Sequence, residues 1–178
     1  ENGSINAYER ALELSPLDLK TRARLIDLLI QCERTDQTLG HYMALGEAQY
    51  NLAQVDEARK TYMEALKIVP PGEEGDEWRH RLLRVIADID MQRLDWKRAI
   101  AAYSELSKSD PGDTMIARSM IDIYYNLGKP EAAMQQLDRH LVYLVRNERG
   151  SEVPGILREL IEERPNDVGL VDRVVRLQ

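Results

Sequence analysis

The 178-residue sequence contains no phenylalanine, a single cysteine, and only 10 glycines and 7 prolines. Aromatic residues make up 6% of the chain, so we expect Leu, Ala, Ile, Val and Met to fill the core. One cysteine cannot form an internal disulfide, so folding requires no oxidising compartment. We therefore expect Cys32 to be a structural thiol and the protein to be cytoplasmic.

Basic clusters and long apolar runs are also absent. The formal net charge is −7 and the isoelectric point is near 5.1. Nucleic acid backbones are bound through clustered Lys and Arg, so we do not expect nucleic acid as the main partner. No stretch approaches the roughly 18 to 20 uninterrupted apolar residues of a membrane-spanning helix, so no membrane span is expected.

The sequence offers little for catalysis or for metal binding. Its three histidines, His41, His80 and His140, are scattered, and no Cys or second His stands at the spacing of metal ligands. There is no phosphate-binding glycine loop, no nucleophile elbow and no metalloprotease motif. We expect no cofactor, no metal, no catalytic residues and no enzymatic activity.

What the sequence does contain is a repeated pattern of small and large residues. Ala58 and Ala99 lie 41 residues apart, and Ala99 and Ala133 lie 34 apart, each within a similar setting. The three settings comprise Leu45-Gly46, Ala58, Tyr62, Ala65 and Pro70; Ile86-Ala87, Ala99, Tyr103, Leu106 and Pro111; and Met120-Ile121, Tyr124, Ala133 and Leu137. A period of this size made of helical segments indicates a solenoid of paired helices.

The clearest repeat predicts two helices, with apolar residues at spacings of three and four from Leu39 to Leu52 and again from Ala58 to Pro70. Pro70 ends the second helix, because proline lacks the backbone N–H and clashes with the preceding turn. Gly46 and Ala58 are predicted to lie where the two helices cross. The Pro-, Gly- and acid-rich segment 70–76 predicts an exposed loop.

This pattern resembles the tetratricopeptide repeat, a helix–turn–helix family, and the match is best from Leu39 to His140. The resemblance implies an all-α fold, a right-handed α-solenoid of antiparallel helix pairs that is irregular at both ends. It implies one domain over residues 1–178: a partial repeat at 4–16, an additional helix at 17–34, repeats at 39–70, 80–111 and 114–147, and partial repeats at 153–178. His140 stands where the family has a small residue, so we expect it to be packed between helices. Because the sequence begins within a repeat, we expect it to be part of a longer protein.

The family binds partners in a concave groove lined by the first helix of each pair. Carried over position by position, the resemblance implies a peptide groove formed by Met43, Glu47, Tyr50, Asn51, Arg81, Arg84, Asp88, Met91, Gln92, Met115, Arg118, Asp122, Tyr125 and Asn126. Asp172 and Arg176 would extend this row. Asn51, Gln92 and Asn126 would form a row of amides able to bind a peptide backbone.

An alternative interpretation assigns these side chains to structural roles. Arg118 and Asp122, like Arg84 and Asp88, are spaced to form ion pairs within one helix. The tyrosines and methionines of the row could pack against a neighbouring helix instead of a ligand. One subfamily holds the carboxylate tail of chaperones, but Glu47 and Asp88 stand where that clamp needs a neutral amide, so this ligand is disfavoured.

The sequence therefore favours a non-enzymatic scaffold that binds a protein or peptide partner. A second hypothesis is self-association, as a homodimer formed through the end helices, because Val168, Val171, Val174 and Val175 form an apolar stripe and terminal repeats usually carry a polar cap. Binding of nucleic acid is a third hypothesis, which the acidic composition disfavours.

Overall fold

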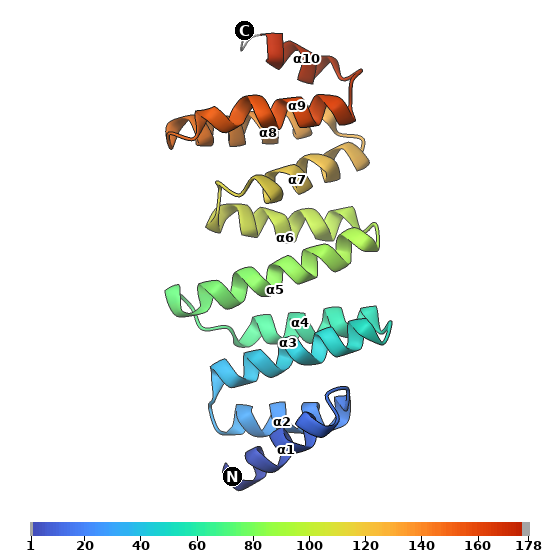
Figure 1. The fold of residues 1–178 in the computed structure, drawn as a ribbon, viewed down its shortest axis with the longest axis vertical. Coiled ribbons are helices and arrows are strands. Elements are labelled where there is room, and N and C mark those ends of the chain that lie inside the picture. The colour runs from blue at the N-terminus through green and yellow to red at the C-terminus, as the bar shows by residue number, and fades with distance from the viewer. Residues whose placement is uncertain (1, 176–178) are drawn as a thin grey trace. The chain divides into compact units, whose positions relative to one another are not determined.

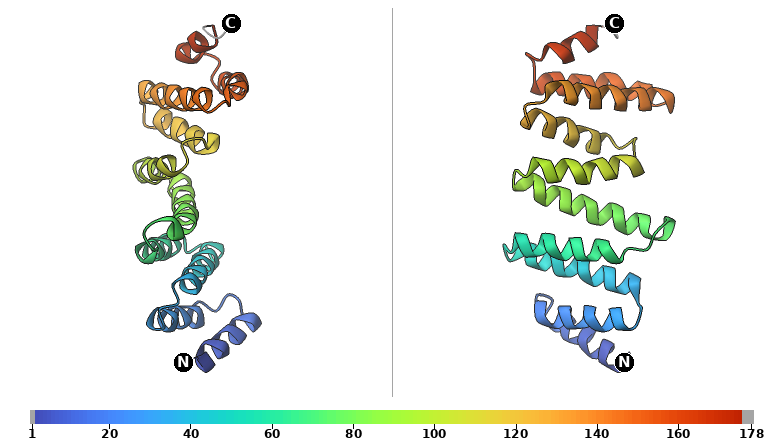
Figure 2. Two further views of the ribbon diagram at one scale, coloured as in Figure 1. Left: turned by 90° about the vertical axis from the view of Figure 1, so that its left-hand side faces the viewer. Right: turned by 180° about the vertical axis from the view of Figure 1, so that it is seen from behind.

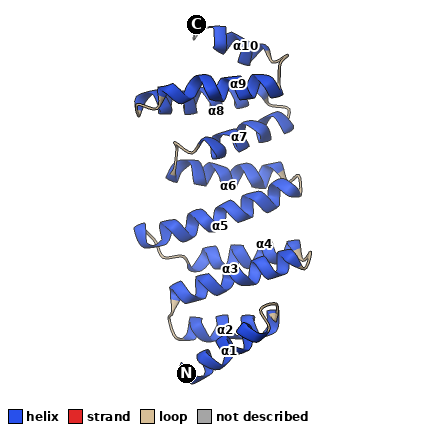
Figure 3. Cartoon of the chain, viewed as in Figure 1, coloured by secondary structure: helices blue, strands red, loops and turns tan. Residues whose placement is uncertain are grey.

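The computed structural model describes residues 2–175 and is helical throughout, without a strand in that range (Figures 1 and 3). The helices are, in chain order, α1 (Asn2–Leu14), α2 (Leu19–Gln31), α3 (Thr35–Asn51), α4 (Val55–Ile68), α5 (Glu73–Gln92), α6 (Trp96–Ser109), α7 (Thr114–Asn126), α8 (Pro130–Arg146), the 3-10 helix η1 (Gly150–Glu152), α9 (Val153–Glu163) and α10 (Val168–Val175).

The chain divides into two compact units, Glu1–Asp95 and Trp96–Gln178. In the first unit α1 packs on α2, α2 on α3, α3 on α4 and α4 on α5. In the second unit α6 packs on α7, α7 on α8 and α9 on α10. Within each unit, helices that follow one another run in opposite directions (Figure 2). The prediction of an all-α fold built from antiparallel helix pairs is confirmed.

Side-chain caps and tight turns determine where the helices begin and end. Asp18 and Asp113 each accept hydrogen bonds from two backbone N–H groups at the start of α2 and α7. These bonds satisfy donors that a helix N-terminus leaves without partners. After α3, Ala53 takes a left-handed conformation with a φ of 60°, as Gly128 does after α7 with a φ of 67°. This conformation is common just past a helix C-terminus and reverses the chain toward the next helix.

The core of the first unit confirms the role predicted for small residues. Ala58 and Ala65 of α4 are fully buried in a cluster that also holds Leu39 and Leu82. Gly46 is buried as well, and a Cβ placed on it would lie 2.4 Å from the ring of Tyr62. Larger side chains at these positions would hold the helix backbones apart.

The core of the second unit has the same character. Ala99 and Ala133 are fully buried, and Leu137 of α8 packs with Leu157 of α9 in one apolar cluster. Within the described residues, no helix of either unit is both long enough and apolar enough to cross a bilayer.

Several predicted helices are confirmed, with shifted boundaries. The single helix expected between Pro16 and Leu39 is α2, and the pair expected in repeat 39–70 corresponds to α3 and α4. The helix α3 begins four residues before Leu39, at Thr35. The boundaries predicted for the repeats and partial repeats stay a prediction.

The exposed loop predicted for residues 70–76 is wrong over its second half. The helix α5 begins at Glu73, and Gly75 in its first turn is buried. Three acidic residues in this turn favour a helix N-terminus, because the helix dipole attracts negative charge there. Gly75 also lets α5 start beside Pro70, since a Cβ at this position would lie 1.9 Å from the carbonyl oxygen of Pro70.

His140 is packed between helices, as the sequence predicted. It is 3% exposed, its Nδ1 lies 3.3 Å from the carbonyl oxygen of Pro111, and its Nε2 lies 3.1 Å from the hydroxyl of Thr114. Burial lowers the pKa of His140, and the nearby charge of Arg149 lowers it further. A neutral ring fits these contacts, with Nδ1–H donating to Pro111 and Nε2 accepting from Thr114.

Candidate functional site

In the first unit, the structure brings four of the predicted groove residues together in one cleft. The cleft lies between α3 and α5, has a volume of about 220 Å³, and is lined by Glu47, Tyr50, Tyr62, Val85, Asp88, Ile89 and Gln92. Glu47 and Tyr50 share a face of α3 because they lie three residues apart, and Asp88 and Gln92 share a face of α5 because they lie four apart. The predicted residues in this cleft are thus Glu47, Tyr50, Asp88 and Gln92.

The cleft combines an apolar floor with acidic side chains. Tyr62 of α4 is 4% exposed, and burial together with the charge of Glu47 raises the pKa of its phenol to about 12. Tyr62 therefore stays neutral at physiological pH. The exposed Tyr50 donates a hydrogen bond of 2.5 Å from its hydroxyl to Oε1 of Gln92, which connects the two walls. Within the described part of the chain, Glu47 has no cationic partner.

The other groove candidates of this unit do not line the cleft. Met43 packs against the core cluster of α3, α4 and α5, as the structural alternative anticipated. The guanidinium of Arg81 lies over the ring of Trp78, 4.7 Å from its centre. Asn51 is exposed at the C-terminus of α3, whereas Met91 and Arg84 are half-buried on α5.

In the second unit, the charged candidates of α7 are bound by the end of α9 and the residues after it. Nη1 of Arg118 donates to Oε2 of Glu159 at 2.6 Å, and Arg118 also binds Glu163. Asp122 accepts a 2.5 Å hydrogen bond from Nη2 of Arg164. The predicted ion pair within α7, between Arg118 and Asp122, is therefore wrong. Both side chains are drawn to opposite charges on the next helix pair instead.

Tyr125 belongs to the same network. Its hydroxyl donates a 2.7 Å hydrogen bond to Oδ2 of Asp167, and the guanidinium of Arg164 lies 4.6 Å from the centre of its ring. Burial, followed by the hydrogen bond to Asp167, raises the pKa of the Tyr125 phenol. Of the remaining candidates, Met115 and Asn126 are exposed on α7.

The predicted extension of the groove row lies at the end of the described residues. Asp172 is exposed on α10. Arg176 and the side chain of Val174 lie outside the described residues. Among the residues that the structure describes, no group of three or more His, Cys, Asp or Glu side chains is arranged to hold a metal ion.

Sequence reasoning missed the polar contacts that join one helix pair to the next. Tyr50 and Gln92, like Asp122 and Arg164, lie 42 residues apart. Trp78 donates to Asp36 and Tyr125 donates to Asp167 over the same separation. A search for complementary polar residues about one repeat apart would have found these partners.

Comparison with known proteins supports the family resemblance. A family model described as Tetratricopeptide repeat matches residues 42–70. A comparison with curated proteins finds no significant match. Among solved structures, a tetratricopeptide repeat protein from Parabacteroides merdae is similar with a TM-score of 0.57 and 19% identity, over 94% of this chain and 70% of that chain.

Two structures of MamA are similar in the same way. MamA AMB-1 gives a TM-score of 0.54 and 15% identity, over 96% of this chain and 98% of that one. MamA from Desulfovibrio magneticus RS-1 gives a TM-score of 0.50 and 17% identity, over 93% and 96%. At these identities the likeness concerns the fold alone.

Residues 42–70 thus match a tetratricopeptide repeat, and the similar solved structures show a fold of the same kind. Members of this class are helical repeat proteins that act as modules for protein interaction, and the repeat is generally non-catalytic.

Proposed function

We propose that the protein is a non-enzymatic scaffold that binds a peptide or helix of a protein partner, and that the cleft between α3 and α5 is its main contact. The observation that carries this proposal is the convergence of Glu47, Tyr50, Asp88 and Gln92 on one cleft. These residues come from two separate helices. Helical repeat proteins commonly bind extended or helical segments on such surfaces.

The chemistry of the cleft favours a cationic side chain of the partner. Glu47 supplies a carboxylate that has no cationic partner among the described residues, and Asp88 of α5 adds negative charge to the same cleft. Tyr62, Val85 and Ile89 offer apolar contact to the methylene groups of a Lys or Arg side chain. We therefore infer a basic peptide segment as the ligand.

The polar candidates of α7 make structural contacts and are not assigned to ligand binding in this proposal. Arg118, Asp122 and Tyr125 already form hydrogen bonds with Glu159, Arg164 and Asp167. Breaking these hydrogen bonds would cost free energy, which would offset part of the free energy gained by binding a ligand there. Of the groove candidates in the second unit, Met115 and Asn126 are therefore the side chains available to a peptide.

Replacement of Glu47 by Gln is expected to weaken peptide binding about tenfold, which corresponds to about 1.4 kcal/mol. The substitution keeps the size of the side chain and removes the charge that would pair with the ligand. The probes are short fluorescein-labelled peptides of Lys and Leu, of Gln and Leu, and of Glu and Leu. Fluorescence anisotropy titrations measure their affinities at low and at moderate salt.

The matched control is Glu13→Gln, which removes the same charge from an exposed position on α1 away from the cleft. It should leave the affinity for the Lys and Leu peptide unchanged. The assignment of the cleft would be contradicted if the Glu47→Gln variant bound the Lys and Leu peptide as tightly as the unmodified chain. It would also be contradicted if the unmodified chain bound the Gln and Leu peptide more tightly than the Lys and Leu peptide.

Self-association is the second candidate function, and exposed valines on α10 favour it. Val168, Val171 and Val175 are 80%, 42% and 64% exposed. A second copy of the chain could cover them, so Val171→Asp should shift a dimer toward monomer in sedimentation velocity runs. A wild-type protein that stays monomeric at high concentration would dispose of this alternative.

A further inference from the structure

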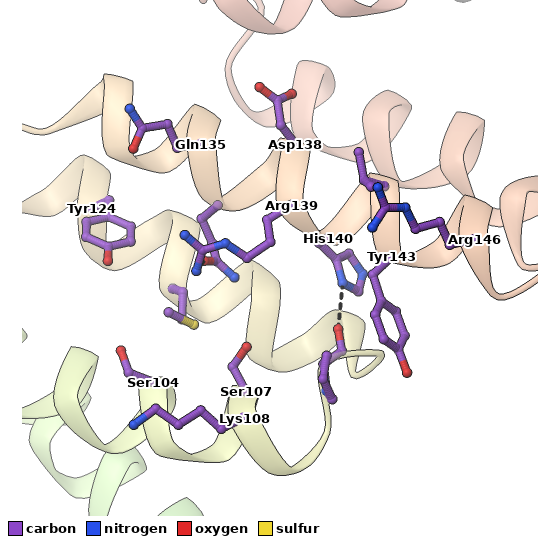
Figure 4. A pocket seen from close by; sticks show the side chains of 14 residues that line it. Ser104, Ser107, Lys108, Tyr124, Gln135, Asp138, Arg139, His140, Tyr143 and Arg146 are labelled. Carbon is purple, nitrogen blue, oxygen red and sulfur yellow. Dashed lines mark hydrogen bonds between the residues drawn. The ribbon is translucent and has the colours of Figure 1, made fainter.

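The exposed face of α8 borders a second concave surface, which the groove candidates do not explain. A cleft of about 730 Å³ lies between α6, α7 and α8, within the second unit (Figure 4). Lys108 and Ser107 of α6 lie on one side of it, and Arg139 and Arg146 of α8 lie on the other. None of the proposed groove residues of α7 lines this cleft.

Positive charge dominates the cleft although the protein as a whole carries a net charge of −7. Its one carboxylate, Asp138, is held at both oxygens by Arg173, at 2.6 and 2.5 Å. Arg139 reaches only the amide oxygen of Gln136, at 3.4 Å. Among the described residues, neither Arg139 nor Arg146 pairs with a carboxylate.

Four arginines of the second unit differ from Arg139 and Arg146 in this respect. Arg118, Arg149, Arg164 and Arg173 each form an ion pair. Lys108 of the same cleft is bound to Glu105 at 2.6 Å on the exposed surface of α6. Arg139 and Arg146, which form no ion pair within residues 2–175, are therefore the sites where the cleft attracts an anion. Guanidinium groups bind carboxylates in a planar, two-pronged geometry.

Apolar side chains lie beside these charges. Met120 is buried on the inner wall of the cleft, and Val142 of α8 is 48% exposed. A second cleft of about 610 Å³ borders the other side of α8 and shares Asp138, Val142 and Arg146 with the first. It adds Val145, which is 62% exposed. The exposed surface of α8 that borders the two clefts thus combines cations with accessible apolar side chains.

We propose that this α8 surface binds an acidic segment of a partner protein, with carboxylates on Arg139 and Arg146 and an apolar side chain against Val142. Charge complementarity identifies the segment as acidic, and the exposed valines call for an apolar residue beside the acids. A nucleic acid would be less suited, because its phosphates need a longer track of cations than two arginines provide. This surface belongs to the second unit and the cleft of α3 and α5 belongs to the first, so the protein would have two binding sites of opposite charge preference.

The test uses a short fluorescein-labelled peptide of Glu and Leu, with the Gln and Leu peptide as its uncharged counterpart. The variant Arg139→Gln/Arg146→Gln is expected to bind the Glu and Leu peptide at least tenfold more weakly than the unmodified chain. Both arginines are exposed, so the variant should keep the helical circular dichroism and the melting temperature. The wild-type affinity should fall with added salt, because the contact is ionic.

Two control variants separate this surface from other causes. Arg158→Gln removes one positive charge from an exposed position on α9 outside the cleft and should leave the affinity unchanged. Glu47→Gln should also leave it unchanged, so a failure of the proposed function at α3 and α5 does not imitate a failure here. The proposal would be overturned if the unmodified chain did not bind the Glu and Leu peptide, or if the arginine variant bound that peptide as tightly as the unmodified chain. Equal affinities of the unmodified chain for the Glu and Leu peptide and for the Gln and Leu peptide would also overturn it. Binding of duplex DNA or of anionic lipid vesicles through Arg139 and Arg146, without binding of the acidic peptide, would overturn it as well.

Discussion

Replacing Arg59 by Met is expected to lower the free energy of unfolding by about 3–5 kcal/mol, the usual loss when one partner of a buried ion pair is removed. Arg59 of α4 binds Asp90 of α5 through two hydrogen bonds, from Nε to Oδ1 at 2.6 Å and from Nη2 to Oδ2 at 2.9 Å. The Asp90 side chain is only 1% exposed. The hydrogen bond with Asp90 raises the pKa of the Arg59 guanidinium, so Arg59 stays charged. Without Arg59, the carboxylate would be buried without its partner.

The neighbouring residue Lys60 provides a matched control, because its ion pair with Glu57 is 74% and 53% exposed. Lys60→Met should change stability by less than about 0.5 kcal/mol, since exposed ion pairs contribute little. Adding Asp90→Leu to Arg59→Met should restore much of the loss, because it removes the buried charge. Urea unfolding followed by circular dichroism measures the free energy of unfolding of the unmodified protein, the two single variants and the Arg59→Met/Asp90→Leu variant. Equal stabilities for the Arg59→Met and Lys60→Met variants would refute the argument.

This ion pair illustrates what the sequence could not reveal. The helices α3 and α4 follow from local patterns, namely the spacing of apolar residues and the proline that ends α4 at Ile68. Arg59 and Asp90 lie 31 residues apart on different helices, and each is an ordinary charged residue in its own surroundings. Their meeting depends on how α4 and α5 pack, which a local pattern does not specify.

In the candidate site, too, local patterns predicted some residues correctly, whereas the contacts that depend on helix packing were not predicted. Glu47, Tyr50, Asp88 and Gln92 were identified because the repeat fixes which face of each first helix is turned to the same side. The roles of Arg118 and Asp122 were assigned wrongly, because the competing partners come from α9 and the residue after it. That part of the sequence departs from the family pattern, so its register relative to α7 could not be derived.

The segment before α5 shows two local preferences in competition. Proline and glycine at residues 70–72 favour a loop, whereas the acids that follow favour the start of a helix. The outcome depends on whether the first turn of α5 can approach Pro70, and Gly75 permits that approach because it has no side chain. A glycine that allows close packing cannot be distinguished from a loop glycine by its sequence context alone.

The second large effect is expected at Gly46, which the sequence did place correctly at a helix crossing. A Cβ on Gly46 would lie 2.4 Å from Cε1 and Cζ of Tyr62, closer than atoms pack without displacement. Tyr62 is 4% exposed and has little space into which to move. Gly46→Leu should therefore destabilise the protein by about 3 kcal/mol or more, at the upper end of the cost of overpacking. Gly46→Ala should still destabilise it, although alanine favours a helix by about 0.8–1.0 kcal/mol over glycine.

Gly40 lies on the same helix and gives the matched comparison for Gly46. A Cβ on Gly40 would meet only Cη2 of Trp78, at 4.0 Å, which is ordinary contact. Gly40→Ala should therefore stabilise the protein, by up to about 1 kcal/mol, through helix propensity alone. Removing the ring with Tyr62→Ala should make the cost of Gly46→Leu smaller, so the double variant would be more stable than the two separate losses predict. Thermal and urea unfolding of these variants tests the clash directly. If Gly40→Ala and Gly46→Ala changed stability in the same direction and by the same amount, the close crossing of α3 and α4 would not be what requires glycine at position 46.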